Sequence, residues 1–383
     1  MQTIIDCGSL AFQGELAHDV RVLVEDGVIR AAGSRLEAPA TAAAIDARQH
    51  IVLPGFIDIH VHGAMDADTM DATPAALRVM AQFFASRGVT SFLPTTMTAS
   101  KEEIDAAIFN VGAAMDDAGD TASGAPRASI LGAHVEGPFV NPKHCGAQPV
   151  QFMRPATPEE YLPWFNSGIV KLITVAPEMD GSMELIAEAK RRGIAVALGH
   201  TDATYAQAMA AFAAGANQAT HTFNAMRGLH HREPGTVGAT MVNDDVFAQL
   251  ICDNIHVHPA AMNALYRCKD SDRLAVITDA MEATGLGDGE FQLGAHHVHV
   301  QAGEARLANG ALAGSTLTMD VAFRNIIAAT GCSIAEASRM CSTTPARAIG
   351  VQDHKGQIAA GYDADLVILD QDLRVVRTII AGK

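Results

Sequence analysis

The sequence predicts an α/β fold: a (β/α)8 TIM-like barrel with a small β-sandwich domain built from both chain termini. The chain has 383 residues, which suits a barrel of about 250 residues with a small companion domain. Short β-rich runs alternate with helical segments through its middle, and both ends resemble short strands. The predicted domains are 1–53 together with 353–383, and 54–352.

The two ends of the chain are expected to form strands of one small β domain. Val20–Glu25 alternates in hydrophobicity, an Asp-Gly turn signal follows it, and Val28–Ala32 returns. Near the other end of the chain, two further runs are rich in β-forming residues, as the N-terminal runs are: Ala364–Leu369 and Val375–Ile380. The middle of the chain is therefore predicted to be inserted between two halves of this domain.

Eight apolar runs are the expected barrel strands: Ile51–His62, Val89–Pro94, Ile130–Glu136, Val170–Val175, Ile194–His200, Gln218–Thr222, Val246–Cys252 and Leu274–Asp279. The expected helices are Pro74–Ser86, Lys101–Met115, Met183–Arg192, Tyr205–Ala214, Pro259–Cys268, Met319–Ala329 and Ile334–Ile349. An open, doubly wound sheet is the alternative, which the lack of a G-x-G-x-x-G fingerprint after the first strand disfavours.

A glycine-rich excursion follows the eighth strand and is expected to form a β-ribbon. It contains His296, His297 and His299, a tract that could suggest a metal site. We interpret these three histidines as residues of a surface strand.

Composition excludes several classes of protein. Hydrophobic residues make up 49% of the chain, which is enough for a large core and excludes intrinsic disorder. The formal net charge of −16 argues against nucleic acid or an anionic membrane as partner. Neither a signal peptide nor a membrane span is recognisable, and the six cysteines form no C-x-x-C pair. A cytoplasmic location is expected.

Polar residues stand at the ends of several predicted strands, where a barrel gathers its loops at one mouth. The two histidines of an H-x-H pair share one side of a strand because side chains alternate. Imidazoles with carboxylates suit zinc, iron, manganese or cobalt. The candidate metal ligands are His60, His62, Glu136, His200, His221 and Asp279.

Several motifs carry a resemblance to a known family. The segment PGFIDIHVHG at 54–63 resembles the first-strand signature of the metal-dependent amidohydrolase superfamily, and GYDADLV at 361–367 is similar to its ending. Within that superfamily, four segments resemble the N-acetylglucosamine-6-phosphate deacetylase family, and the likeness covers essentially the whole chain. They are HVEGPF at 134–139, GHTDA at 199–203, HTFNAM at 221–226 and LAGSTLTM at 312–319.

The resemblance implies a metal centre of one or two divalent ions. Glu136, His200 and His221 are the implied ligands of the main ion. The fourth strand has no lysine at its end, so Glu136 takes the place of the bridging carboxylated lysine of many amidohydrolases. His60 and His62, with Glu136 and Asp279, make a second ion feasible. Zinc is the metal expected first, with iron, manganese and cobalt as alternatives.

Asp279 is the implied catalytic carboxylate. A metal ion lowers the pKa of bound water and polarises a carbonyl. Asp279 would take a proton from the attacking water and deliver it to the amine leaving group. The expected reaction is hydrolysis of the acetamide of N-acetylglucosamine 6-phosphate to glucosamine 6-phosphate and acetate.

The resemblance also implies a substrate-binding set for an amino-sugar phosphate. Arg232 would bind the phosphate, because its fork suits bidentate contact. Such a loop often serves the neighbouring subunit in this family, which implies a homodimer. Asn224 and Ala225 would add amide donors, and His256 would contact the sugar or the phosphate. The remaining members of the set are Ala147, Gln148, Leu312, Ala313 and Gly314.

The loop after Glu136 departs from the family pattern. Several relatives carry a histidine that aids carbonyl polarisation where this chain has Gln148, which can donate a hydrogen bond only as a neutral group. Cys145 in the same loop could approach the metal as a thiolate, or have no role. His134 could support a ligand or simply fill the barrel interior.

Two other functions are weighed against deacetylation of the sugar phosphate. One is an amidohydrolase for another N-acyl or cyclic amide, which the phosphate set and the 312–314 loop disfavour. The other is a catalytically silent scaffold on the same fold. It predicts loss of a ligand or of Asp279, and the sequence retains them all.

Overall fold

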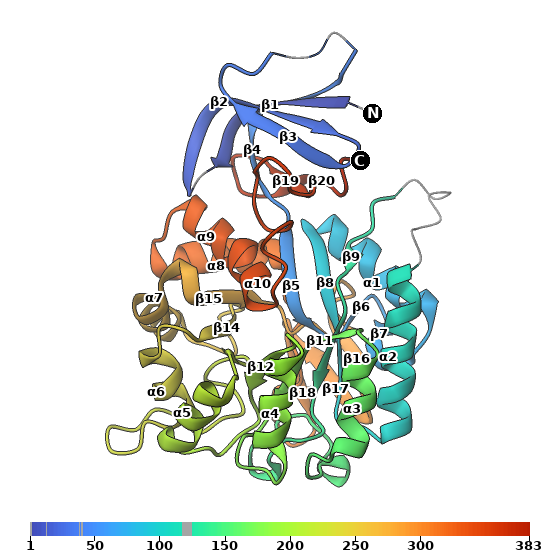
Figure 1. Cartoon of the computed structure of the whole chain (residues 1–383), viewed down its shortest axis with the longest axis vertical. Coiled ribbons are helices and arrows are strands. Elements are labelled where there is room, and N and C mark those ends of the chain that lie inside the picture. Colours follow the sequence, from blue (N-terminus) through green and yellow to red (C-terminus); the bar gives the residue numbers. More distant parts are fainter. Residues whose placement is uncertain (1, 13, 38, 40, 117–124) are drawn as a thin grey trace.

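The protein is a parallel barrel surrounded by helices, with a second sheet at one end (Figure 1). The computed structural model describes residues 2–12, 14–37, 39, 41–116 and 125–383. The predicted fold class, a TIM-like barrel with a sheet from both termini, is confirmed.

Eight parallel strands follow one another around the barrel in chain order. Almost all of their residues are buried, as expected for strands covered on both faces. The ring is closed between its first and last strands, where Asp279 N–H donates to His60 O at 2.9 Å and His62 N–H donates to Ala280 O at 2.8 Å. The strands are β5 (Phe56–Val61), β8 (Val89–Thr96), β10 (Ala133–Glu136), β11 (Val170–Val175), β12 (Ala195–Leu198), β13 (Gln218–Ala219), β14 (Phe247–Ile251) and β15 (Leu274–Ile277).

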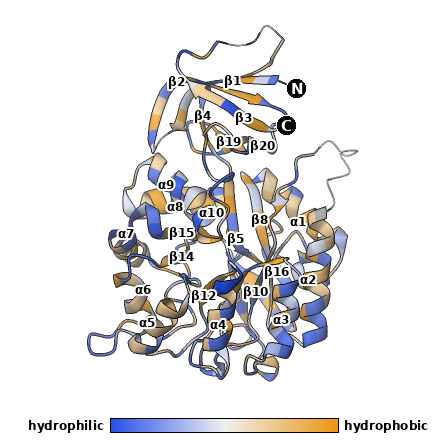
Figure 2. Ribbon diagram, viewed as in Figure 1, coloured by the Kyte–Doolittle hydropathy of each residue, from blue (hydrophilic) through white to orange (hydrophobic). Residues whose placement is uncertain are grey.

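Helices cover the outside of the barrel, and several of them carry one polar and one apolar face (Figure 2). In α1, Leu77, Met80 and Phe84 recur at helical spacing and are buried. Its first turn is capped by Thr73, whose hydroxyl accepts the Ala76 N–H at 3.3 Å. The helices are α1 (Pro74–Ser86), α2 (Lys101–Asp116), α3 (Pro158–Asn166), α4 (Ser182–Arg191), α5 (Tyr205–Ala214), α6 (Gly235–Val242), α7 (Pro259–Arg273), α8 (Met319–Thr330), α9 (Ile334–Cys341) and α10 (Thr343–Ala348).

Strands from both ends of the chain form one six-stranded sheet in the order β20-β19-β4-β1-β2-β3. The expected hairpin is present at Asp26 and Gly27, which both have positive φ, 51° and 82°. Residues of all six strands share one hydrophobic cluster. The strands are β1 (Gln2–Phe12), β2 (Glu15–Glu25), β3 (Val28–Gly33), β4 (Ala43–Pro54), β19 (Leu366–Leu369) and β20 (Val375–Ile379).

The run Ile51–His62, predicted as one strand, is divided between the two sheets. Its first part belongs to β4 of the terminal sheet and its second part is β5 of the barrel. Gly55 separates them, and its N–H donates to Asp365 O at 2.9 Å. A β-carbon there would lie 2.2 Å from Thr90 Cγ2, so the two sheets approach closely at this point. Residues 51–57 contain no polar side chain, which hides the division at Gly55 from the sequence.

The helical predictions differ from the structure in four places. Helices α3 and α6 were not predicted, because Pro163 lies inside the first and two glycines lie in the second. The expected single helix Ile334–Ile349 is two helices, broken at Ser342 with φ −135° and ψ −72°. Helix α7 continues past the predicted end at Cys268 to Arg273, with Asp270 non-helical inside it.

Small sheets complete the described chain. The predicted ribbon is present as three antiparallel strands, β16 (Gly289–Leu293), β17 (His296–Gln301) and β18 (Glu304–Leu307), and His297 and His299 are exposed on it. The pair β6 (Gly63–Ala64) and β7 (Ala67–Asp68) follows β5, and β9 (Ser129–Ile130) pairs with β8. Within the described residues, no helix combines the length and apolarity needed to span a bilayer.

Candidate metal centre

All six predicted metal ligands lie together at the carboxyl-terminal ends of the barrel strands. Parallel strands end at a common rim, so residues far apart in the sequence converge there. His60 lies in β5 and His62 directly follows it, whereas Glu136 is the last residue of β10. The other three each stand two residues beyond a strand: His200 after β12, His221 after β13 and Asp279 after β15. All six are buried.

The ligand atoms form two groups that meet at Glu136. One group is Glu136, His200 and His221, and the other is His60, His62 and Asp279. Glu136 Oε1 lies 3.2 Å from the Nε2 atoms of His200 and His221 and 3.5 Å from His60 Nε2. Glu136 Oε2 lies 3.4 Å from His62 Nε2. The carboxylate therefore faces both groups at once.

Asp279 completes the second group. Its Oδ1 lies 3.4 Å from His60 Nε2 and 3.2 Å from His62 Nε2. Burial alone would raise the pKa of Asp279, but His60, His62 and His221 outweigh it and hold the pKa at about 2. Asp279 is therefore ionised at neutral pH.

Three of these residues have left-handed backbone. The φ angles are 48° at His200, 28° at His221 and 52° at Asp279. Such angles are uncommon for residues with a β-carbon and tend to cluster at functional sites. The strands stop before each of these residues, and the turn directs its side chain across the mouth of the barrel.

Each of the four histidines presents Nε2 to the centre because its Nδ1 is engaged elsewhere. Three of the Nδ1 atoms face backbone carbonyls: His62 faces Thr95 O at 3.2 Å, His200 faces His144 O at 2.9 Å, and His221 faces Asn224 O at 3.2 Å. His60 Nδ1 instead faces the side-chain oxygen of Gln249 at 3.1 Å. A carbonyl only accepts, so Nδ1 carries the proton and Nε2 keeps its lone pair for a ligand.

The chemistry of this donor set fits divalent metal ions. His60 Nε2 is buried and has no hydrogen-bond partner, although a buried polar atom normally has one. Nitrogen and carboxylate donors in groups of three match zinc and related ions. For Glu136, burial would raise the pKa, but the neighbouring histidines, led by His60 and His200, hold it well below the usual range. This carboxyl group is thus ionised and ready to bind a cation.

A cavity of about 260 Å³ opens onto the ligands. Seven of the predicted substrate residues line it: Ala147, Gln148, Asn224, Ala225, His256, Leu312 and Gly314. Asn224 Nδ2 is buried without a hydrogen-bond partner, so this amide is available to a bound molecule. Ala313 is fully buried and is absent from the lining residues.

His256 is held in place by a neighbouring carboxylate. Its Nδ1 lies 2.6 Å from Asp253 Oδ2, and Asp253 Oδ1 accepts the backbone N–H groups of Ile255 and His256 at 2.8 Å. Burial would raise the pKa of Asp253, but its bond to His256 lowers it. The arrangement fixes the imidazole at the edge of the cavity.

Arg232 lies outside this cavity in the single chain. It is exposed on the loop before α6, with its Nη1 2.8 Å from His231 Nε2. Among the described residues, no lysine or arginine lines the cavity. Cys145 is half-buried and also lies outside the lining, although the next residue, Gly146, belongs to it.

His134 and the ribbon histidines are not among the candidate ligands, although the His134 ring lies 4.6 Å from that of His60. His134 is buried in the barrel, with Nε2 2.8 Å from Thr174 Oγ1 and Nδ1 3.3 Å from Thr95 Oγ1. Burial lowers its pKa well below the usual value, and its bonded partners are hydroxyl groups. On the ribbon, His299 pairs with Glu290 at 2.8 Å. No metal-ligand group includes these histidines within the part of the chain that the structure describes.

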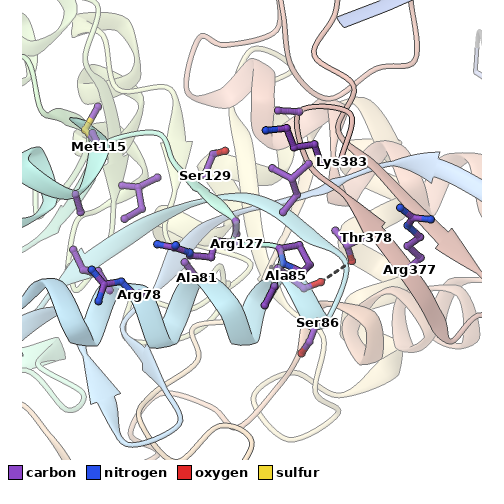
Figure 3. Close-up of a pocket in the computed structure, with 18 of the residues that line it drawn as sticks. Arg78, Ala81, Ala85, Ser86, Met115, Arg127, Ser129, Arg377, Thr378 and Lys383 are labelled. Carbon is purple, nitrogen blue, oxygen red and sulfur yellow. Dashed lines mark hydrogen bonds between the residues drawn. The ribbon is translucent and has the colours of Figure 1, made fainter. Parts of the chain in front are cut away.

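A larger cavity of about 1020 Å³ lies far from the ligands, between α1 and β20 (Figure 3). Arg78, Arg127 and Arg377 line it, and Thr378 Oγ1 donates to Ala85 O at 2.6 Å within it. None of the predicted site residues belongs to this cavity. Size therefore does not identify the active site, whereas the convergence of ligands does.

Comparison with known proteins finds a family and relatives that match most of the chain. The model of the amidohydrolase family matches residues 51–383. The N-acetylglucosamine-6-phosphate deacetylase of Bacillus subtilis is 41% identical over 334 residues, which are 87% of this chain and 84% of that protein. The N-acetylgalactosamine-6-phosphate deacetylase of Escherichia coli O157:H7 is 39% identical over 367 residues, 95% of this chain and 94% of that protein.

A solved structure is similar over the whole length. It is a mutant of the N-acetyl-D-glucosamine-6-phosphate deacetylase of Mycobacterium smegmatis in complex with N-acetyl-D-glucosamine-6-phosphate. The sequence identity is 33%, the TM-score is 0.91, and the match covers 100% of this chain and 98% of that one. The terminal sheet and the barrel thus occur together in this relative.

Proposed function

The chain belongs to the amidohydrolase family and, within it, to the N-acetylglucosamine-6-phosphate deacetylases, and from this premise we propose that it hydrolyses N-acetylglucosamine 6-phosphate. The products are glucosamine 6-phosphate and acetate, as in amino-sugar catabolism or cell-wall sugar recycling. The observation that carries the proposal is the complete set of six ligands with an ionised Asp279 beside a cavity lined by Asn224, Ala225 and His256.

Two groups of residues would hold the metal ions. Glu136, His200 and His221 would hold the main metal ion, and His60, His62 and Asp279 would hold a second one. A bound divalent ion would lower the pKa of water and polarise a carbonyl group. Zinc suits these nitrogen and carboxylate ligands best, with iron, manganese and cobalt as alternatives.

Asp279 is the proposed general base and acid. Its low pKa keeps Oδ1 and Oδ2 free of protons at pH 7, so it can accept a proton from the attacking water. It then delivers that proton to the nitrogen of the leaving amine, which must be neutralised as the amide bond breaks. Asp279 has a side-chain exposure of 11%, so the carboxylate can reach a molecule in the cavity.

The phosphate end of the site needs a cation from elsewhere. The whole chain carries a net charge of −16, and the cavity of one chain has no lysine or arginine among its described lining residues. We assign this cation to Arg232 of a second copy, which makes the active form a homodimer. Asn224, the Ala225 backbone and His256 would bind the sugar phosphate from the same chain as the metal ligands.

Apolar and small residues would enclose the acetyl group and the sugar. Met97, Leu293 and Leu312 line the cavity, and each buries apolar surface that an acetyl methyl group can contact. Ala147 and Gly314 line it as well. Ala313 would support this loop from its buried position. The small residues leave room for a substrate close to the ligands.

The remaining assignments concern the whole chain. We propose the domains 1–53 with 353–383, and 54–352, because the terminal strands have their own hydrophobic cluster. We also propose a cytoplasmic location. All six cysteines are free thiols, which suits a reducing compartment.

The decisive experiment is acetate release by the purified chain. N-acetylglucosamine 6-phosphate is expected to react, the unphosphorylated sugar to react far more slowly, and chelation to abolish the reaction until zinc is restored. Equal rates with both sugars would contradict the phosphate site. No release from either sugar by zinc-loaded protein would contradict the proposed reaction.

One relative favours a second substrate for the same site. The deacetylase of Escherichia coli O157:H7, 39% identical over 95% of this chain, is named for N-acetylgalactosamine 6-phosphate. N-acetylgalactosamine 6-phosphate differs from N-acetylglucosamine 6-phosphate only in the orientation of one hydroxyl group. The same assay with both sugar phosphates decides between them, through the ratio of their kcat/KM values.

A further inference from the structure

Two buried glutamines connect His60 to a helix end on the outside of the barrel ring. His60 Nδ1 lies 3.1 Å from Gln249 Oε1, and Gln249 Nε2 donates to Gln218 Oε1 at 3.0 Å. Gln218 Nε2 donates in turn to Ala348 O at 2.9 Å. All three side chains are 0% exposed. We propose that Gln249 and Gln218 are positioning residues that fix His60 as a ligand of the second metal ion.

The direction of the three bonds is set at one end. Ala348 is the last residue of α10, and its carbonyl is one of the helix's final carbonyls, which have no partner within the helix. This oxygen can only accept, so Gln218 must present its NH₂ group to it and its oxygen to Gln249. Gln249 must then present its NH₂ group to Gln218 and its oxygen to His60. Asn217 Nδ2 also donates to Ala348 O, at 3.0 Å.

The consequence for His60 is a single tautomer. An amide oxygen accepts a proton from Nδ1, which leaves the lone pair on Nε2. If Gln249 turned over, its NH₂ group would face Nδ1 and favour a proton on Nε2, where a metal ion could not bind. A lone glutamine can turn over, whereas one held by Gln218 and Ala348 cannot.

The other three histidines do not need such a device. His62, His200 and His221 each face a backbone carbonyl, which cannot be reversed. His60 alone relies on side-chain amides, and its Nε2 is the buried atom that has no hydrogen-bond partner. Failure of the glutamine pair should therefore affect His60 first. The inference rests on the proposed function, since it requires the second ion.

Zinc binding, measured by calorimetry on the chelator-stripped full chain, tests the proposal without any assay of activity. The wild type is expected to bind two zinc ions. Gln249→Met should weaken the second ion about 10- to 100-fold, as for other groups that orient a ligand, and leave the first within about twofold. Gln218→Met, which does not touch His60, should weaken the second ion to a smaller extent.

Whether the losses of zinc affinity in the Gln218 and Gln249 variants add up shows whether the two glutamines act as one connected pair or separately. The double variant Gln218→Met with Gln249→Met should lose no more affinity than Gln249→Met alone, because the pair acts through one atom. Gln301→Met, on the exposed ribbon, controls for the substitution itself. If Gln249→Met does not fold, Gln218→Met still tests the connection.

Three outcomes would contradict the proposed role of the glutamines, and they differ in what they imply for the proposed function. Two zinc ions in the wild type with the second unaffected by Gln249→Met would overturn the role of the glutamines and leave the proposed function intact. Equal weakening of both ions would show a merely structural role and overturn it as well. A wild type that binds only one zinc ion would remove the second ion from the proposed function, and the positioning role with it.

Discussion

Gln148 donates its side-chain N–H to Glu136 Oε2 at 2.7 Å, and its own oxygen accepts the Thr98 N–H at 2.7 Å. A backbone N–H can only donate, so Thr98 fixes the orientation of the amide and directs its NH₂ group at the carboxylate. Glu136 is the residue that faces both groups of ligands. Gln148 is thus placed to orient the Glu136 carboxylate, in addition to lining the cavity.

The first prediction concerns this contact. Gln148→Met removes the bond to Glu136 and should lower zinc affinity about 10- to 100-fold, with kcat/KM falling in parallel at limiting zinc. Zinc content after dialysis, measured by mass spectrometry, checks this. Full zinc content with a fall in kcat alone would instead assign Gln148 to the substrate carbonyl, the role expected from its place in the sequence.

The second prediction concerns proton transfer. Asp279→Asn keeps the shape of the side chain but removes the base, so kcat should fall by at least about 10²-fold. The group formed by Glu136, His200 and His221 is intact in this variant and should retain one zinc ion. Asp288→Asn, at an exposed position, is the matched control. Near-normal turnover by Asp279→Asn would refute the assignment.

The third prediction tests whether Arg232 acts across a dimer. Arg232→Ala should raise KM for the sugar phosphate and leave the slow reaction of the unphosphorylated sugar unchanged. Mixing it with Asp279→Asn under conditions that exchange subunits should restore about a quarter of wild-type activity, since random pairing of a symmetric dimer leaves one intact site in each mixed dimer.

The unmixed variants are the controls for that experiment. Activity is restored only if Arg232 of one chain acts at the site of the other chain. In a mixed dimer, the Arg232→Ala chain supplies Asp279 and the Asp279→Asn chain supplies Arg232. If mixing merely averages the two activities, Arg232 does not act in trans. Sedimentation of the wild type independently reports whether a dimer is present.

The fourth prediction concerns stability against pH. Lys269 in α7 is buried and donates to Thr240 O at 3.0 Å and Asn243 O at 2.5 Å. Burial lowers its pKa from 10.5 to about 8. Between these values the unfolded chain binds more protons than the folded one, so the contribution of Lys269 to stability rises with pH from about 8 to 10.5.

Urea unfolding of Lys269→Met and the wild type between pH 7 and 10 checks this sign. The difference in unfolding free energy should shift in favour of the wild type as pH rises, by about 3 kcal/mol at most. Lys190→Met, at an exposed position, should show no such trend. A difference that is constant with pH would contradict the lowered pKa.

Some of the fold could be predicted because its signals are local. The alternation of apolar runs with helical segments indicates the barrel, and the ends of these runs place His60, Glu136 and Asp279 at its mouth. Short-range patterns cannot reveal α6, whose glycines disfavour a helix in isolation. Packing in the intact protein stabilises it nonetheless, with six of its residues buried.

By itself, the sequence predicted the alternation of barrel strands with helices, the family and a candidate set of metal ligands, because each of these rests on local patterns and short motifs. Only the tertiary structure decided which groups orient those ligands. Gln249 and Gln218 lie 31 residues apart, and 189 residues separate Gln249 from His60. A polar residue in a strand predicts no partner, since a hydrogen bond depends on distances and angles that only the closed barrel sets.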